Sequence, residues 1–227
     1  MTIPERINDV QAAILQAELA SAREPGSVQL LAVSKGQGID AIKAAFSAGL
    51  SAFGESYLQE AREKITALSS FPIEWHFIGP IQSNKAKVIA QQFNWVHSVY
   101  RKKIAWQLNE ARSQTLPRLN ICLQVNMDNQ KEAGISPSEL AEFAQYILTL
   151  PRLHLRGLMM IPNPDLDENQ LYLTFFQLAN MLRSLNTQLH LYLDILSMGM
   201  SDDLQIAIRA GSTMIRIGRA IFGERTL

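Results

Sequence analysis

The sequence predicts an α/β fold, a single (β/α)8 TIM barrel with one additional helix at its N-terminus. Short apolar segments of strand character alternate with amphipathic helical segments along almost the whole chain, and eight strands are counted. This alternation requires parallel pairing through right-handed crossovers, and 227 residues match the usual size of one barrel. We therefore expect residues 1–227 to form one domain, with an open doubly wound sheet as the alternative.

The first expected element is an amphipathic helix outside this alternation. Over residues 5–23, Ile7, Val10 and Ile14 recur at helical spacing, and the helix is expected to end before Pro25. Strands are expected at residues 28–34, 52–54, 75–79, 95–99, 120–125, 153–161, 189–196 and 214–217. Helices are expected at residues 39–48, 57–68, 84–93, 102–113, 168–185 and 202–210, with one more beginning near residue 136.

The helix near residue 136 has the clearest start signal. Ser136 is expected to cap it, Pro137 to occupy its first turn and Glu139 to complete a capping box. Ser83 is likewise expected to cap a helix, with Lys85 facing solvent.

The composition indicates a globular protein without excess charge. Hydrophobic residues make up 47% of the chain, and 21 Lys and Arg balance 21 Asp and Glu. A net charge of zero provides no field for a polyphosphate backbone, so we expect no nucleic-acid partner. The charged N-terminus differs from a signal peptide and no apolar run is long enough to span a membrane, so we expect a cytoplasmic protein without membrane contact. The lone Cys122 is expected to be a buried structural thiol.

Candidate functional residues lie just after the strands, because barrels place their reactive groups at the carboxyl ends of the strands. Lys35 follows an apolar run on the same face as Leu31 and Val33, so its side chain starts among apolar neighbours. A desolvated lysine loses its proton more readily, and its amine can then attack a carbonyl to form a Schiff base. The alternative is a lysine that extends from a strand end into solvent.

Two loops near the end of the chain together indicate an anion site. Ser201 lies between the seventh strand and the next helix, and Gly218 and Arg219 follow the eighth strand. Barrels often hold a phosphate between these two loops. The alternatives are a helix cap at Ser201 and an ordinary turn at Gly218.

Other polar residues near strand ends give weaker indications. Glu55 is either a base or positioning group or, more simply, a solvated carboxylate. The four histidines lack metal-binding spacing, so they are expected in the core or at its rim, and no metal site is expected.

Several segments, spread in order over nearly the whole chain, form a pattern typical of one protein family. The most specific are SMGMSDD at residues 197–203 and RIGRAIFG at residues 216–223. The others are AVSK at residues 32–35, FGE at 53–55, WHFIG at 75–79, QSNK at 82–85 and LRGLM at 155–159. With these motifs the chain resembles the pyridoxal phosphate homeostasis protein family.

The resemblance implies a barrel like the N-terminal domain of alanine racemase, with pyridoxal 5'-phosphate (PLP) held as a Schiff base on Lys35. It also implies that Ser201 and the backbone of Gly218 and Arg219 hold the phosphate, and that Arg216 lies near the pyridine nitrogen. With two further residues flanking the cofactor, the implied PLP contacts are Lys35, Ser56, Met198, Ser201, Arg216, Gly218 and Arg219.

The chain departs from the family pattern at four places. Residues 36–38 read Gly-Gln-Gly where Thr and often Pro are usual, which implies a more flexible loop after the lysine. Ser56 stands where Asn is usual and Pro80 where His is usual. Arg219 replaces a usual Thr, so its N–H and its guanidinium become the candidate phosphate donors, unless the guanidinium points to solvent.

The chemistry of Arg216 favours a carrier over an enzyme, because an arginine beside the ring nitrogen disfavours the protonation that makes PLP an effective electron sink. We expect a monomeric PLP-binding protein without robust turnover, acting in intracellular vitamin B6 and amino-acid homeostasis, with PLP-dependent apoenzymes as candidate partners. One alternative is a PLP-dependent amino-acid racemase, which requires a second base; alanine racemase takes it from an additional domain that we do not expect here. A phosphosugar isomerase barrel, with Lys35 incidental, is a further alternative.

Overall fold

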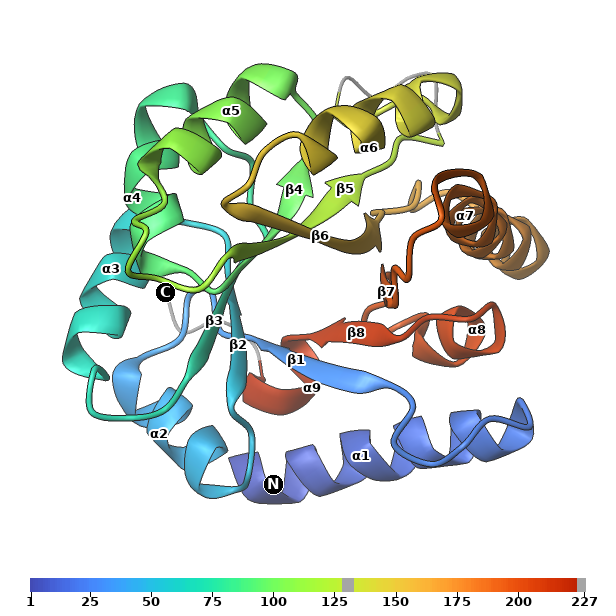
Figure 1. The fold of residues 1–227 in the computed structure, drawn as a ribbon. Helices are drawn as coiled ribbons and strands as arrows, with labels where there is room; N and C mark the ends of the chain where they lie inside the picture. The colour runs from blue at the N-terminus through green and yellow to red at the C-terminus, as the bar shows by residue number, and fades with distance from the viewer. Residues whose placement is uncertain (128–132, 224–227) are drawn as a thin grey trace.

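The computed structural model describes residues 1–127 and 133–223 of the protein. Its centre is a closed barrel of parallel strands in the order β1 to β8, with β8 returning to pair with β1 (Figure 1). The predicted (β/α)8 barrel is therefore confirmed, and the open sheet is excluded. The strands are β1 Gln29–Val33, β2 Ala52–Glu55, β3 Glu74–Phe77, β4 Trp95–Val99, β5 Leu119–Gln124, β6 Leu153–Met159, β7 Ile195–Ser197 and β8 Met214–Ile217.

Helices surround the barrel, because each connection between parallel strands crosses its outer face (Figure 1). They are α1 Ile3–Ala20, α2 Ile39–Ser47, α3 Leu58–Ala67, α4 Ala86–Gln92, α5 Lys102–Ala111, α6 Leu140–Leu148, α7 Glu168–Leu189, α8 Leu204–Arg209 and α9 Arg219–Phe222, with the 3-10 turns η1 Ser83–Lys85 and η2 Pro137–Glu139. The additional helix α1 begins with a capping box between Thr2 and Glu5. It packs against α8 and α9, beside the seam where β8 meets β1.

The seventh strand is shorter and later than predicted. Residues 189–194 were expected to extend it, but α7 continues to Leu189 and the strand starts at Ile195. The side chain of Asn186 accepts from the N–H of Leu193 and donates to its carbonyl, which ties the returning chain to the end of α7. Of residues 189–194 only Leu193 is buried, and Tyr192 is 98% exposed, so apolar character alone did not distinguish a loop from a strand.

Ser136 occupies the N-cap position and Pro137 the first turn, as predicted, but the side-chain cap and capping box expected there are absent, and the Ser83 cap is wrong. The hydroxyl of Ser136 donates to the carboxylate of Glu139 instead of capping a backbone N–H, and residues 137–139 form a 3-10 turn before α6. Ser83 is itself the first residue of η1, which has no side-chain cap. In both segments a 3-10 turn precedes the α-helix, and its tighter geometry places the serine differently from an α-helical cap. Lys85 faces solvent as expected.

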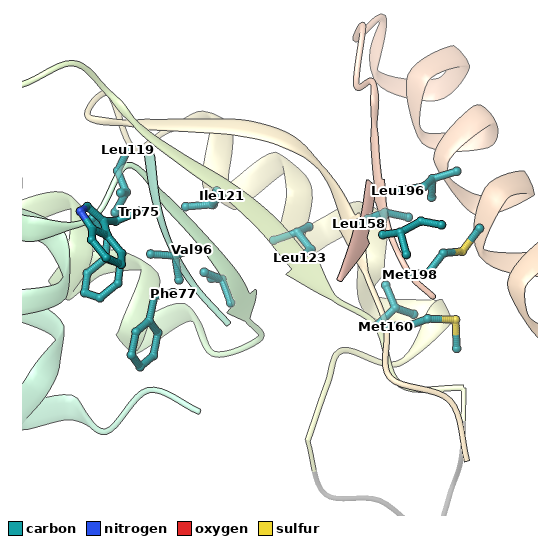
Figure 2. Packing of buried hydrophobic residues seen from close by; sticks show 14 of the residues in the cluster. Trp75, Phe77, Val96, Leu119, Ile121, Leu123, Leu158, Met160, Leu196 and Met198 are labelled. Carbon is teal, nitrogen blue, oxygen red and sulfur yellow. The ribbon is translucent and has the colours of Figure 1, made fainter. Parts of the chain in front are cut away.

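Alternation along each strand divides the buried side chains between two layers. Outward residues such as Leu119, Ile121 and Leu123 of β5 pack in the main hydrophobic cluster beneath the helices (Figure 2). Inward residues form a smaller cluster inside the barrel, where Cys122 meets Trp95 and side chains of four other strands. Cys122 is completely buried, as predicted, and burial raises the pKa of its thiol to about 12. The barrel interior is thus filled by a packed layer of side chains.

Candidate functional site

A cavity of about 470 Å³ opens at the carboxyl ends of the strands, where the barrel fold places its reactive groups. Six of the seven predicted contact residues line it. They are Lys35, Ser56, Ser201, Arg216, Gly218 and Arg219. Residues that the sequence analysis did not select complete the wall: Val33, Gln37, Ile78, Met159, Ile161, Met200, Asp202 and Gly223. Several of these are apolar residues just past a strand, a position that gives no chemical signal in the sequence.

Met198 is the predicted contact that does not line the cavity. Its side chain is fully buried in the outer cluster beside Leu196, Leu158 and Met160 (Figure 2). Because side chains alternate along a strand, an inward Ser197 requires an outward Met198. The methionines that line the cavity are instead Met159 and Met200.

Lys35 lies at the end of β1 and is half-buried in the cavity wall. The backbone that carries it is held on both sides. The N–H of Gly36 donates to the carboxylate of Glu60 over 2.6 Å, and the N–H of Gln37 donates to the carbonyl of Ser34 over 3.0 Å. Gly36 adopts a φ of 74°, a left-handed conformation that favours glycine. The glycine-containing loop is therefore a turn held by two hydrogen bonds, and the bond to Glu60 restricts the flexibility that its sequence implies.

A buried charged cluster lies behind this loop, between β2 and α3. The Lys64 ammonium donates to the carboxylates of Glu55 and Glu60 and to the carbonyl of Ser34. The hydroxyl of Ser34 also donates to Glu55, over 2.6 Å. Burial raises the pKa of the Glu55 carboxyl, although the neighbouring Lys64 acts in the opposite direction. Glu55 is thus neither a solvated carboxylate nor a residue of the cavity wall, and it supports the loop of Lys35 from behind.

Arg216 is buried on the floor of the cavity. It comes from β8, and its guanidinium donates to the carbonyl and hydroxyl of Ser197 and to the carbonyl of Met160. Its own backbone N–H donates to the carbonyl of Gly199, a residue whose φ is 97°. Burial lowers the pKa of Arg216 to about 10, so the side chain remains a cation at neutral pH.

The two loops predicted to hold an anion meet at one side of the cavity. Ser201 and Asp202 follow β7, and Gly218 and Arg219 follow β8. The guanidinium of Arg219 donates to the carboxylate of Asp202 over 2.8 Å, and both side chains are largely exposed. Ser201 does not cap α8, which begins only at Leu204, so its hydroxyl is not used by that helix. The alternative of a helix cap at Ser201 is therefore excluded, whereas the Arg219 guanidinium is largely exposed and pairs with Asp202 at the edge of the cavity.

Ser56 is positioned by a close approach of two loops. A Cβ atom on Gly79 would lie 2.2 Å from the carbonyl oxygen of Ser56, so only glycine fits there. The WHFIG motif thus brings its glycine against the loop after β2 and fixes the backbone of Ser56 in the cavity wall.

His76 and His97 are fully buried inside the barrel, below the cavity. His76 stacks on Trp95 with the ring centroids 5.3 Å apart. The structure therefore confirms the core interpretation for these two histidines. Their connection to Arg216, described below, had no signal in the sequence because it crosses the barrel.

Comparisons with known proteins agree with this arrangement. The family model "Alanine racemase, N-terminal domain" matches residues 10–226. A pyridoxal phosphate homeostasis protein of Pseudomonas aeruginosa is 50% identical over 225 residues, covering 99% of this chain and 96% of that protein. The chain belongs to the pyridoxal phosphate homeostasis protein family. The resemblance inferred from the motifs is thereby confirmed.

Solved structures of similar proteins show the same fold. PipY of Synechococcus elongatus, in a structure with PLP bound, has a TM-score of 0.87 and 34% sequence identity, covering 98% of this chain and 100% of that one. An alanine racemase from Corynebacterium glutamicum has a TM-score of 0.74 at 14% identity, covering 97% of this chain and 62% of that one. The second likeness concerns the barrel alone. In this chain, no helix within residues 1–127 and 133–223 is both long enough and apolar enough to cross a bilayer.

Proposed function

We propose that this protein binds PLP covalently through Lys35 and acts as a carrier of the cofactor in intracellular vitamin B6 and amino-acid homeostasis. The observation that carries the proposal is the single cavity wall shared by Lys35, the buried Arg216 and the paired loops of Ser201 and Arg219. These groups supply an amine for an aldehyde, a donor for a ring nitrogen and donors for a phosphate. Family membership and the PLP bound to PipY support the same cofactor.

The chemistry of the residues fits PLP. A cavity of about 470 Å³ lies within the usual range for small-molecule sites. Ser201 offers a hydroxyl, and the first N–H groups of the turn at Gly218 and Arg219 have no acceptor within α9. The Arg219 guanidinium adds a cation that Asp202 holds at the cavity mouth. Apolar side chains such as Ile78 and Met159 suit the faces of an aromatic ring.

The role of Lys35 is nucleophilic attack. Its neutral amine adds to the aldehyde carbon, a C=N bond forms and one water molecule leaves, so the step is reversible and needs no redox partner. When bound, PLP would supply a reactive aldehyde that an incoming amine can take over. The turn held by Glu60 and Ser34 keeps the backbone of Lys35 at the cavity wall.

The remaining cavity wall supports a carrier rather than a racemase. Among the described lining residues, Asp202 is the only carboxylate, and it is exposed and paired with Arg219. The wall contains no histidine, tyrosine or cysteine among these residues. A racemase requires a second proton-transfer group on the face opposite its lysine, and this wall offers no suitable candidate. The homeostasis names of the relatives agree with this interpretation.

The covalent assignment is tested by reduction with borohydride and peptide mapping. Protein incubated with PLP should become yellow, and the reduced adduct should map to Lys35. Lys35→Ala should lose the absorbance, whereas Lys85→Ala, an exposed lysine on η1, should keep it. An adduct at another lysine would overturn the assignment.

Racemisation assays with single amino acids test the carrier role. We expect rates no higher than those of free PLP, together with transfer of PLP to a PLP-dependent apoenzyme. A rate well above free PLP would favour the racemase alternative. We further propose that the protein acts in the cytoplasm and that residues 1–227 form a single domain. We also propose that it is a monomer, and size-exclusion chromatography with light scattering tests this oligomeric state.

A further inference from the structure

A chain of hydrogen bonds runs through the interior of the barrel from the cavity to the opposite end. The Arg216 guanidinium lies 2.9 Å from the Ser197 hydroxyl, which lies 2.8 Å from Nδ1 of His97. Nε2 of His97 lies 2.9 Å from Nδ1 of His76, whose Nε2 lies 2.9 Å from the carboxylate of Glu74. Strands β4 and β7 are not neighbours in the sheet, so His97 and Ser197 meet across the barrel.

The two ends of this chain differ in depth and in charge. Ser197, His97 and His76 are completely buried, whereas the side chain of Glu74 is 49% exposed. Glu74 is the first residue of β3 and therefore lies at the amino end of the barrel. The Arg216 cation in the cavity and the Glu74 carboxylate near solvent are thus connected through one hydroxyl and two imidazole rings.

The chemistry of the ends fixes the direction of every hydrogen bond. A guanidinium only donates, so the Ser197 oxygen accepts from Arg216. A carboxylate only accepts, so His76 must donate to Glu74 through Nε2–H, which leaves its Nδ1 as an acceptor. His97 then donates from Nε2–H to His76, and its Nδ1 accepts a hydrogen bond from the Ser197 hydroxyl. Burial lowers the pKa of both histidines, so each carries a single ring proton at neutral pH.

We propose that Ser197, His97, His76 and Glu74 are positioning residues for Arg216, forming a one-directional relay that holds its guanidinium in place beneath the cofactor. Among the described residues Arg216 has no carboxylate within ion-pair distance; the nearby Asp203 carboxylate offsets part of its buried charge, and the aligned dipoles of the relay add to this compensation.

The relay leaves donors of Arg216 for a ligand. An arginine has five N–H groups, and the contacts to Ser197 and Met160 use both on Nη1 and one on Nη2. Nε–H and the second Nη2–H remain for the cavity that Arg216 lines. This step rests on the proposed function. If PLP binds as proposed above, Arg216 can only donate to its ring nitrogen and therefore keeps that nitrogen unprotonated.

The direction of the relay is testable without PLP. In the full chain labelled with 15N-histidine, two-bond correlation spectra should show His76 and His97 as Nε2–H tautomers. Glu74→Gln introduces an amide that donates as well as accepts, so an Nδ1–H fraction should appear at both rings. His97 does not contact Glu74, so a change there reports transmission through the relay. Glu142→Gln, in an exposed pair with Lys102, is the control and should leave both tautomers unchanged.

Three outcomes of this experiment would overturn the relay. An Nδ1–H tautomer at either ring in the wild type would contradict its direction. An unchanged spectrum in Glu74→Gln would remove Glu74 from it, and a change confined to His76 would show that the chain does not transmit.

The action on Arg216 is tested by Ser197→Ala with PLP labelled with 15N at the ring nitrogen. The variant loses one charge-assisted hydrogen bond, so the Kd for PLP should rise about tenfold and the ring-nitrogen resonance should shift. Thr149→Val removes a hydroxyl that lies at the end of α6, outside the cavity wall, and donates to the Tyr146 carbonyl, so this control should change neither. An unchanged Kd and resonance in Ser197→Ala would refute the positioning role. A wild type that does not bind PLP would refute the proposed function but leave the tautomer result standing.

Discussion

Replacing Lys64 by methionine should strongly destabilise the protein. The ammonium is nearly inaccessible to solvent, and its three protons are donated to Glu55, Glu60 and the Ser34 carbonyl. Glu55 is completely buried, and its second carboxylate oxygen has no partner among the described residues. Methionine preserves much of the apolar side chain but removes the charge, so a buried carboxylate loses its compensating cation.

The expected loss follows from that uncompensated charge. Removing one member of a buried ion pair typically costs about 3–5 kcal/mol, a large part of the ~5–15 kcal/mol that stabilises a protein. For a chain of this size the same loss corresponds to a Tm lower by about 6–20 °C. Restoring neutrality should recover most of it, so Lys64→Met combined with Glu55→Gln should be more stable than Lys64→Met alone.

The loss of stability in Lys64→Met should also depend on pH, and the protonation of Glu55 decides whether it is larger at high or at low pH. Burial raises the pKa of this carboxyl in the folded protein, and removing Lys64 raises it further. The folded variant then binds a proton that the unfolded chain releases above its ordinary pKa. Stability is therefore retained at low pH and lost as the pH rises through the folded pKa, so Lys64→Met should be least impaired near pH 5.

Urea unfolding followed by tryptophan fluorescence at pH 5 and pH 8 measures both effects. Lys43→Met is the matched control, because Lys43 is 46% exposed and lies 3.9 Å from an exposed Asp40. Such a surface pair contributes about 0–1 kcal/mol. A Lys64→Met variant as stable as this control, or equally impaired at both pH values, would refute the reasoning.

Three further predictions follow from burial and close packing. Gly157→Ala should prevent folding or lower Tm by more than about 10 °C, because the added Cβ would lie 1.8 Å from a carbonyl oxygen of β7. Gly38→Ala is the control in the same thermal scan and should change Tm little, because no atom lies within 4 Å of the added Cβ. Burial lowers the pKa of His76 and His97, so the unfolding free energy should decrease as the pH drops below about 6.5, by up to ~1.4 kcal/mol per pH unit for each histidine. An unfolding free energy, measured in urea, that stays constant between pH 7 and 5.5 would contradict this. Cys122 should not react with a thiol reagent at pH 8 until the protein is unfolded in urea, because burial raises the pKa of its thiol to about 12.

The fold was predictable because one rule applies along the whole chain. Apolar runs separated by amphipathic helices can be buried together only as parallel strands with helical crossovers, and the closed barrel follows from their number. The errors are local. Leu191 and Leu193 resemble a strand by apolarity, but they follow a helix whose end is set by side-chain contacts of Asn186. Such contacts between segments leave no mark on the periodicity.

The candidate site was predictable where chemistry coincides with a strand end. Lys35, Ser201 and Arg219 carry functional groups at the rim, and the cavity joins them as expected. Met198 was misplaced because the motif that contains it was treated as a unit, while strand alternation separates neighbouring side chains. Lys64 was missed because its helix position looks like an ordinary solvated lysine.

The two buried polar networks divide the support of the cavity between them. The cluster of Lys64 and Glu60 lies outside the barrel wall and holds the backbone after Lys35, whereas the chain from Glu74 to Ser197 lies inside and holds Arg216. Each network therefore controls one group of the proposed cofactor site from a side that the cofactor does not touch. Because a partly satisfied buried network is costly, each also penalises a displaced loop or guanidinium. This arrangement explains how a loop with two glycines can keep the backbone that follows Lys35 in place.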